Sequence, residues 1–100
     1  MRYSILFMIE SFKCNETEKI FNRQFSRKLP QNIQKIAFRK LRMLNRSSTM
    51  NDLKVPPANR LEALSGERKG QYSIRINDLW RICFKWGKGN AYEVEIVDYH

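Results

Sequence analysis

The chain has 100 residues, of which 42% are hydrophobic and 29% charged, and this balance indicates one folded domain and excludes a disordered segment. Lysine and arginine number 19 against 10 acidic residues, so the formal net charge is +9. Such an excess on a small domain is typical of proteins that bind polyanions, although a basic surface without a dedicated partner is the plainer alternative. A membrane surface is the less favoured partner.

The first seven residues, 1–7, are expected to be an extension before a single domain at 8–100, because Met8 would itself make a sensible start. Their apolar run is shorter than the hydrophobic region of a signal peptide, so we expect a cytoplasmic protein. Two distant cysteines, Cys14 and Cys83, and a single histidine are too few ligands for the usual zinc sites. We therefore expect no metal and no other cofactor.

The N-terminal half predicts a short strand and then a helical hairpin. The strand should include Ile9 and Phe12. A first helix should be capped by Asn15, whose side chain would accept a hydrogen bond from the amide of Glu18, and should run through Phe25. A second helix should start at 30–32, because apolar residues then recur at helical spacing, namely Ile33, Ile36, Ala37, Leu41 and Leu44.

The C-terminal half predicts antiparallel strands. A polar, turn-rich connection covers 45–57, with a short turn near 50–53. Apolar and polar residues then alternate in the segments 72–76, 80–86 and 92–96, which is the pattern of half-buried strands. The order predicts an α+β fold, in which an N-terminal strand and a helical hairpin pack on one face of a twisted, mainly antiparallel sheet.

The alternation also predicts how these strands pair. A three-residue loop at 77–79 keeps one face apolar by pairing Ile74 with Ile82, and it makes Arg75 and Arg81 direct cross-strand neighbours. A five-residue loop at 87–91 does the same for the next hairpin. It aligns the apolar residues in two pairs, Trp86 with Tyr92 and Phe84 with Val94, and sets Lys85 opposite Glu93.

The predicted register gathers cations on the face away from the core. Arg75 and Arg81 repel each other there unless an anion lies between them, and Tyr99 would share this face one pleat beyond Val97, which lies opposite Arg81. The alternative is that both arginines extend into solvent.

At the rim of this face, His100 would be able to donate and accept a proton near neutral pH, and Asp98 and Tyr99 directly precede it. The alternative is that the histidine is a frayed tail residue.

A glycine-bracketed loop at 65–70 carries a second basic cluster, Arg68 and Lys69. Glycines allow a phosphate backbone to approach closely, although many hairpin loops have this composition.

Four segments together resemble the HigB toxins, which are plasmid-maintenance killer proteins of the RelE/ParE superfamily. These segments are 8–12, 60–75, 77–84 and the terminal 95–100, and the likeness covers residues 8–100. The resemblance implies the RelE-like fold of microbial RNases, ribosome-dependent cleavage of mRNA at the 30S A site, and inhibition of translation. It also implies a HigA-type helix-turn-helix antitoxin as partner, through which alone the toxin would reach operator DNA.

The terminal Asp98, Tyr99 and His100 and the position of Arg81 match the family's active-site pattern. Where some HigB toxins have a catalytic histidine on the strand before the glycine loop, this chain has Glu62. Either Glu62 substitutes as a base or an orienting carboxylate, or His100 and Tyr99 share the work.

The glycine loop departs from the family at one further position. Ser65 stands where some HigB toxins have a lysine just before the first glycine, and Arg68 or Lys69 could supply the missing charge.

The expected chemistry is metal-independent attack of the RNA 2′-hydroxyl on the adjacent phosphodiester. In it His100 acts as acid or base, Arg81 and Arg75 stabilise the phosphorane, Tyr99 stacks on the nucleotide, and Asp98 orients His100. Two alternatives remain from the sequence: a ParE-like toxin that inhibits DNA gyrase, and a module that binds RNA or the ribosome without chemistry.

Overall fold

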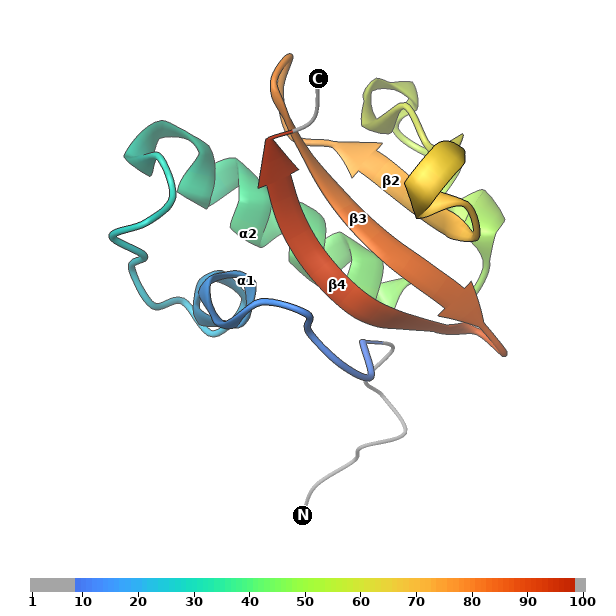
Figure 1. The fold of residues 1–100 in the computed structure, drawn as a ribbon, viewed down its shortest axis with the longest axis horizontal. Helices are drawn as coiled ribbons and strands as arrows, with labels where there is room; N and C mark the ends of the chain where they lie inside the picture. Colours follow the sequence, from blue (N-terminus) through green and yellow to red (C-terminus); the bar gives the residue numbers. More distant parts are fainter. Residues whose placement is uncertain (1–8, 99–100) are drawn as a thin grey trace.

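The computed structural model describes residues 9–98, which form two helices and a four-stranded sheet. The helices are α1 (Asn15–Phe21) and α2 (Gln31–Arg46), and the strands are β1 (Glu62–Ala63), β2 (Gln71–Arg75), β3 (Trp80–Gly87) and β4 (Asn90–Asp98). The strands are antiparallel in the order β1-β2-β3-β4, and both helices lie against the same face of the sheet (Figure 1). This confirms the predicted α+β fold.

The core lies between α2 and the sheet. The apolar seam of α2 is buried at Ile33, Ala37, Leu41 and Leu44, as its spacing predicts. From the sheet, the core receives the inward positions of the three longer strands: Ile74, Ile82, Phe84, Val94 and Ile96. The connection after α2 contains short 3-10 turns at Met50–Lys54 and Pro57–Asn59, in agreement with the turn predicted near 50–53.

The predicted N-terminal strand forms only two isolated bridges. Ile9 and Phe12 bridge to Ala91 and Val94 of β4, and both bridges are parallel. The N–H of Val94 donates to the carbonyl of Ser11 at 3.1 Å. The segment therefore covers the edge of β4 without becoming a full strand.

The first helix is shorter than predicted and lacks the predicted cap. Cys14 occupies the N-cap position without a side-chain hydrogen bond, and Asn15 is already helical. The helix ends at Phe21 because Arg23 adopts a left-handed conformation with φ 64°. Phe25 consequently lies outside the helix. The buried Ser26 hydroxyl organises the connection to α2 by donating to Glu16 and accepting from the N–H groups of 28 and 29.

The hairpin between β2 and β3 has the predicted register, with Ile74 opposite Ile82 and Arg75 opposite Arg81. The hairpin between β3 and β4 differs from the prediction. Its turn is only two residues, Lys88 and Gly89, both with positive φ of 53° and 79°, as in the tight turns that match strand twist.

The β3–β4 ladder contains an irregularity, and it compensates for the observed turn being shorter than the predicted one. Near the turn Trp86 pairs with Ala91 instead of the predicted Tyr92, and the register shifts between Cys83 and Lys85. The shift coincides with a positive φ of 52° at Glu93, which indicates a β-bulge. Beyond the bulge, the predicted register returns. The predicted Lys85–Glu93 pair survives as an ion pair of 3.4 Å.

Candidate functional site

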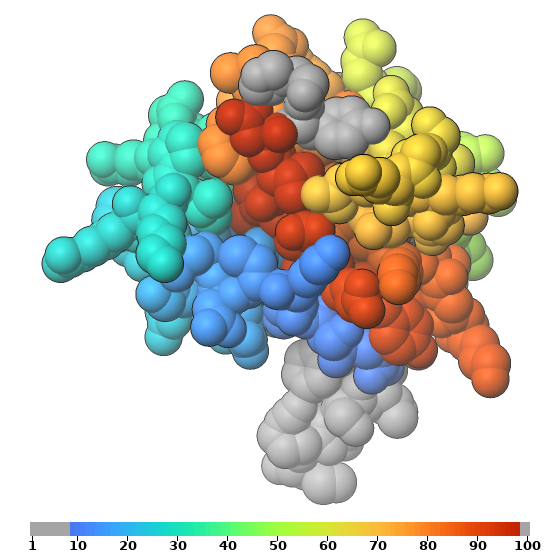
Figure 2. All heavy atoms as spheres, in the orientation of Figure 1, coloured from blue at the N-terminus to red at the C-terminus, as the bar shows by residue number. Residues whose placement is uncertain are grey.

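The face of the sheet turned away from the helices carries several of the predicted site residues, namely Glu62, Arg75 and Arg81. Side chains alternate along a strand, so the residues between the core positions of β2, β3 and β4 point to this face. The segment 60–70, in yellow, lies against β4, in red, over part of the face (Figure 2). The exposed side of the sheet therefore forms a surface bordered by this segment and by the C-terminal end of β4. The side chains on this face are Ser73, Arg75, Arg81, Cys83, Glu95 and Val97.

Arg81 is fixed near the centre of this face and is only 8% exposed. Its Nε donates to the hydroxyl of Ser73 at 2.7 Å, and its Nη2 donates to the backbone carbonyl of Arg60. The carbonyl is directed at Arg81 by a left-handed residue, since Arg60 has a φ of 46°. The alternative that Arg81 extends into solvent is therefore wrong.

Glu62 lies next to this arginine. It belongs to the two-residue strand β1 and pairs with Ser73, which places both on the same face as Arg81. Its Oε1 is 4.0 Å from Nη2 of Arg81, and its side chain is 53% exposed. Glu62 is thus close enough to orient the guanidinium and open enough to meet a ligand.

Arg75 is the cross-strand neighbour of Arg81, as predicted, but the two guanidiniums have different partners. Arg75 forms an ion pair with Asp78 in the loop between β2 and β3. Arg81 is held by Ser73 and by a backbone carbonyl instead. Partners within the chain therefore offset the repulsion for which the sequence alone suggested a bound anion.

The glycine loop brings only one of its predicted cations into the face. Arg68 ends a 3-10 turn, Gly66–Arg68, and its Nη1 lies 3.0 Å from Oε1 of Gln71 and 3.1 Å from Oε2 of Glu95. Lys69 and Ser65 are exposed on the outside of the loop. The loop thus offers one oriented and one solvent-facing cation.

Glu95, Ser73 and the carbonyl of Arg60 are site features that the sequence reasoning did not single out. Glu95 accepts from Arg68 and forms a second ion pair with Lys13 at 3.7 Å. The register contained the signal for two of them, because Glu95 and Ser73 both pair with Cys83 and so share the face of Arg81. Nothing in the sequence indicates the carbonyl of Arg60, whose position depends on a single left-handed residue.

Of the three predicted C-terminal site residues, the structure describes Asp98. Asp98 is the last residue of the strand, is exposed and pairs with Trp80 at the start of β3. Val97 pairs with Arg81, as predicted. The predicted Tyr99 and His100 lie outside the described residues, as does the predicted extension at 1–7.

Cys83 lies in the middle of the face but is fully buried. Burial raises the pKa of its thiol, with a smaller opposing contribution from Arg68 and others. Cys83 is therefore the core or near-core residue that the sequence predicts. Its buried, protonated thiol is also a poor nucleophile. Within residues 9–98, no three His, Cys, Asp or Glu side chains gather in an arrangement that could hold a metal ion.

Two solved structures share the fold of this chain. A solved structure of a histidine-to-glutamine mutant of YafQ from E. coli superimposes with a TM-score of 0.57 at 18% sequence identity, and the match covers 90% of each chain. Unmutated YafQ from E. coli strain BL21(DE3) gives a TM-score of 0.54 with the same coverage.

Sequence comparison gives the family. Residues 10–100 match the family model described as the RelE-like toxin of the type II toxin–antitoxin system HigB. The chain is 43% identical over 65 residues to Toxin HigB-1 of Vibrio cholerae, a match that covers 65% of this chain and 68% of that protein. It is 31% identical to Endoribonuclease HigB of Proteus vulgaris over 93% of this chain and all of that protein. This chain belongs to the HigB family of toxins, and such a toxin has an antitoxin as its partner. Among the described residues, no helix is long and apolar enough to cross a membrane.

Proposed function

We propose that this chain is a ribosome-dependent endoribonuclease that cuts mRNA and thereby inhibits translation in the cytoplasm. The observation that carries the proposal is the fixed guanidinium of Arg81 on the outer face of the sheet, beside the strand end that leads to Tyr99 and His100. The Proteus vulgaris relative is named an endoribonuclease, and it matches this chain over 93% of its length.

The proposed reaction uses the 2′-hydroxyl of the RNA and no metal. A base removes the 2′-hydroxyl proton, the oxygen attacks the adjacent phosphorus, and the 5′-oxygen leaves as an acid protonates it. Each positioned proton transfer contributes about 10²–10⁴ in rate. His100 serves as acid or base, Asp98 orients it, and Tyr99 stacks on the nucleotide at the cleaved bond.

Arg81 stabilises the phosphorane. Its bonds to Ser73 and Arg60 use Nε and Nη2, and a guanidinium has further N–H donors that can bind a phosphate oxygen. Glu62, 4.0 Å away, acts as the second proton-transfer group or as the carboxylate that orients Arg81. An oriented hydrogen-bond donor such as the guanidinium of Arg81 stabilises a transition state by about 3–4 kcal/mol.

The remaining predicted residues bind the RNA backbone. Arg75 and Arg68 exchange their carboxylate partners, Asp78 and Glu95, for phosphates, which costs little because such partly exposed pairs are weak. Lys69 and Ser65 contact the backbone from the exposed side of the glycine loop. The ribosome positions the mRNA, which a site with so few groups does not do alone.

The partner that restrains this activity is a HigA-type helix-turn-helix antitoxin. We propose that the toxin reaches operator DNA only through this antitoxin.

Primer extension on mRNA after brief expression of the chain tests the proposal. Wild type should give codon-phased cuts, whereas His100→Ala and Arg81→Ala should give none. Lys54→Ala, a cation change away from the site, is the matched control and should cut like wild type. Uncut mRNA together with inhibited DNA supercoiling would identify a gyrase inhibitor instead. Uncut mRNA with salt-sensitive RNA binding would identify a binding module.

A further inference from the structure

The net positive charge of this chain comes from one stretch of its sequence. Residues 19–51 contain nine lysines and arginines and no acidic residue. The rest of the chain contains ten basic and ten acidic residues and is therefore balanced. The charged stretch includes the end of α1, the connection after it and the whole of α2. The excess charge thus belongs to the two helices and their connection and not to the sheet face that carries the candidate site.

The cations of the two surfaces differ in their partners. On the sheet face, Arg68, Arg75 and Lys85 each form an ion pair with a carboxylate. On α2 and just after α1, within the part of the chain that the structure describes, no carboxylate forms an ion pair with any of five cations. These are Arg23, Lys35, Arg39, Arg42 and Arg46. These five cations are therefore available to an acidic partner.

Four of these cations form a stripe on the outer side of α2. Lys35, Arg39, Arg42 and Arg46 follow at intervals of four, three and four residues, which places them above one another on a helix. The stripe is about 16 Å long at 1.5 Å per residue. It lies opposite the buried seam of the helix, so it faces away from the sheet.

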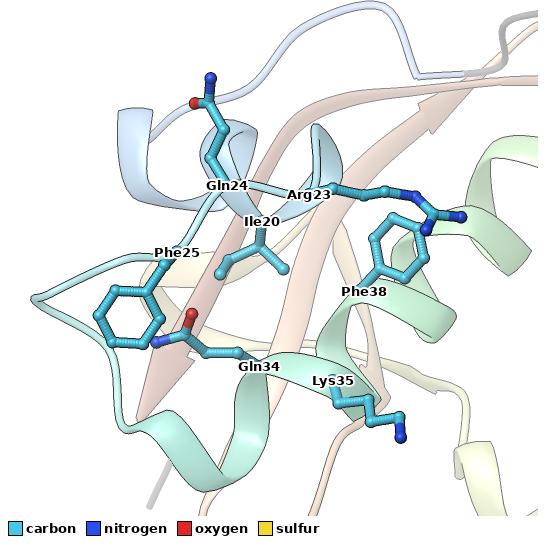
Figure 3. A pocket seen from close by; sticks show the side chains of 7 residues that line it. All are labelled: Ile20, Arg23, Gln24, Phe25, Gln34, Lys35 and Phe38. Carbon is cyan, nitrogen blue, oxygen red and sulfur yellow. The ribbon is translucent and has the colours of Figure 1, made fainter.

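A groove runs beside this stripe, between α2 and the segment that follows α1. It consists of two adjoining hollows of about 440 and 390 Å³, which share Arg23 and Phe38 in their walls. In the first hollow, Ile20 lies between Phe25 and Phe38, with Lys35 at the rim (Figure 3). Phe25 is 62% exposed, so its ring is accessible to a partner beside this apolar hollow.

The cations and the aromatic rings of the groove are combined in one surface. The guanidinium of Arg23 lies 4.7 Å from the ring centre of Phe38, and that of Arg42 lies 5.8 Å from the same ring. Guanidinium groups over the ring leave little room for a nucleic-acid base to stack on it. An apolar floor with a cationic rim instead suits an amphipathic helix with acidic flanks.

We propose that this groove is the docking site for an acidic amphipathic helix of the antitoxin. Its apolar side chains enter the hollow between Phe25 and Phe38, and its carboxylates pair with Arg39 and Arg42. The proposal rests on the membership of this chain in the HigB family, because a toxin of this family has an antitoxin as its partner. It does not depend on the proposed cleavage chemistry.

Charge reversal in the groove tests this proposal. The variant is Arg39→Glu with Arg42→Glu, and the matched control, Lys54→Glu with Lys88→Glu, makes the same charge change at exposed positions away from the helices. The probe is the purified antitoxin encoded beside the gene for this chain, and the readout is its dissociation constant. We expect the groove variant to bind at least 100-fold more weakly and the control to stay within threefold of wild type. A second variant, Phe25→Ser, should weaken binding about tenfold without changing any charge.

Two further measurements distinguish a loss of docking from a loss of folding and test its effect in cells. Thermal unfolding of each variant shows whether it is folded, and co-expression with the antitoxin shows whether a folded variant escapes neutralisation. Groove variants that are folded and bind the antitoxin like wild type would overturn the proposal. So would unchanged antitoxin binding with weakened binding to purified 30S subunits, which would make the groove an RNA surface. Tight, groove-dependent antitoxin binding by a wild type that cuts no mRNA would leave the docking site standing and refute the proposed cleavage alone.

Discussion

Replacing Ser73 by alanine should destabilise the protein mainly through Arg81. The serine hydroxyl accepts from Nε of Arg81 at 2.7 Å, and both residues are buried. A hydrogen bond to a charged group contributes about 1.5–3 kcal/mol, and its loss leaves a buried N–H without its acceptor. We therefore expect Ser73→Ala to lower the free energy of unfolding by about 2 kcal/mol. For a domain of this size the midpoint of thermal unfolding should fall on the order of 10 °C.

A double-mutant cycle separates this hydrogen bond from other effects of the substitution. Urea unfolding of wild type, Ser73→Ala, Arg81→Met and the double variant gives the coupling free energy between the two side chains. The geometry predicts a coupling of about 1.5–3 kcal/mol. Ser48→Ala, which removes a hydroxyl from an exposed turn, is the matched control and should change stability little. A coupling below about 0.5 kcal/mol would refute the view that Ser73 holds Arg81 in place.

Three further predictions concern other parts of the molecule. Thr17→Val should lower stability by about 1–3 kcal/mol in urea unfolding, because the fully buried hydroxyl accepts the backbone N–H of Ile96 at 2.9 Å; an unchanged midpoint would contradict this. Backbone N–H groups lower the pKa of Asp52, so its contribution to stability is present above the unfolded pKa and is lost as the pH falls through the folded value. Asp52→Asn should therefore flatten the dependence of the unfolding free energy on pH below about pH 4, and an unchanged acid limb would refute the assignment. Burial raises the pKa of the Cys83 thiol, so a thiol reagent at about pH 8 should label Cys14 first and Cys83 only on unfolding, and equal labelling rates would contradict its burial.

The elements that the sequence predicts well are those in which one periodicity determines the outcome. The seam of α2 buries Ile33, Ala37 and Leu41 because apolar residues recur at helical spacing along that face. The hairpin of β2 and β3 has a unique register that keeps Ile74 and Ile82 on the core face, so its pairing was predictable residue by residue.

The errors occur where a single backbone conformation determines the structure. The end of α1 depends on the left-handed Arg23, and a non-glycine residue at positive φ has no signal in a hydrophobic pattern. The β3–β4 turn was predicted too long because the alternation alone excludes a two-residue turn. The β-bulge near Glu93 adds one residue to β4 relative to β3. The alternation of side chains is thereby shifted by one position, so the two-residue turn still leaves the apolar residues of β4 on the core face.

The candidate site was predictable as a set of positions but not as a set of partners. The register places Arg75 and Arg81 together, and this is what the structure has. It does not indicate that Arg75 pairs with Asp78 in the adjoining loop, or that a backbone carbonyl at residue 60 reaches Arg81. Those partners come from loops, whose course no side-chain period encodes.

The nature of these partners distinguishes Arg81 from the other cations of the sheet face. A buried cation is costly unless its N–H groups are satisfied, and Arg81 meets this need with three neutral oxygens, the hydroxyl and carbonyl of Ser73 and the carbonyl of Arg60. Neutral acceptors fix the guanidinium without cancelling its charge, and the Oε1 of Glu62 approaches it only to 4.0 Å. Arg68, by contrast, is in direct contact with the carboxylate of Glu95. Arg81 therefore has both its position and its positive field in place before an anion arrives, which is the arrangement that electrostatic stabilisation of a transition state requires.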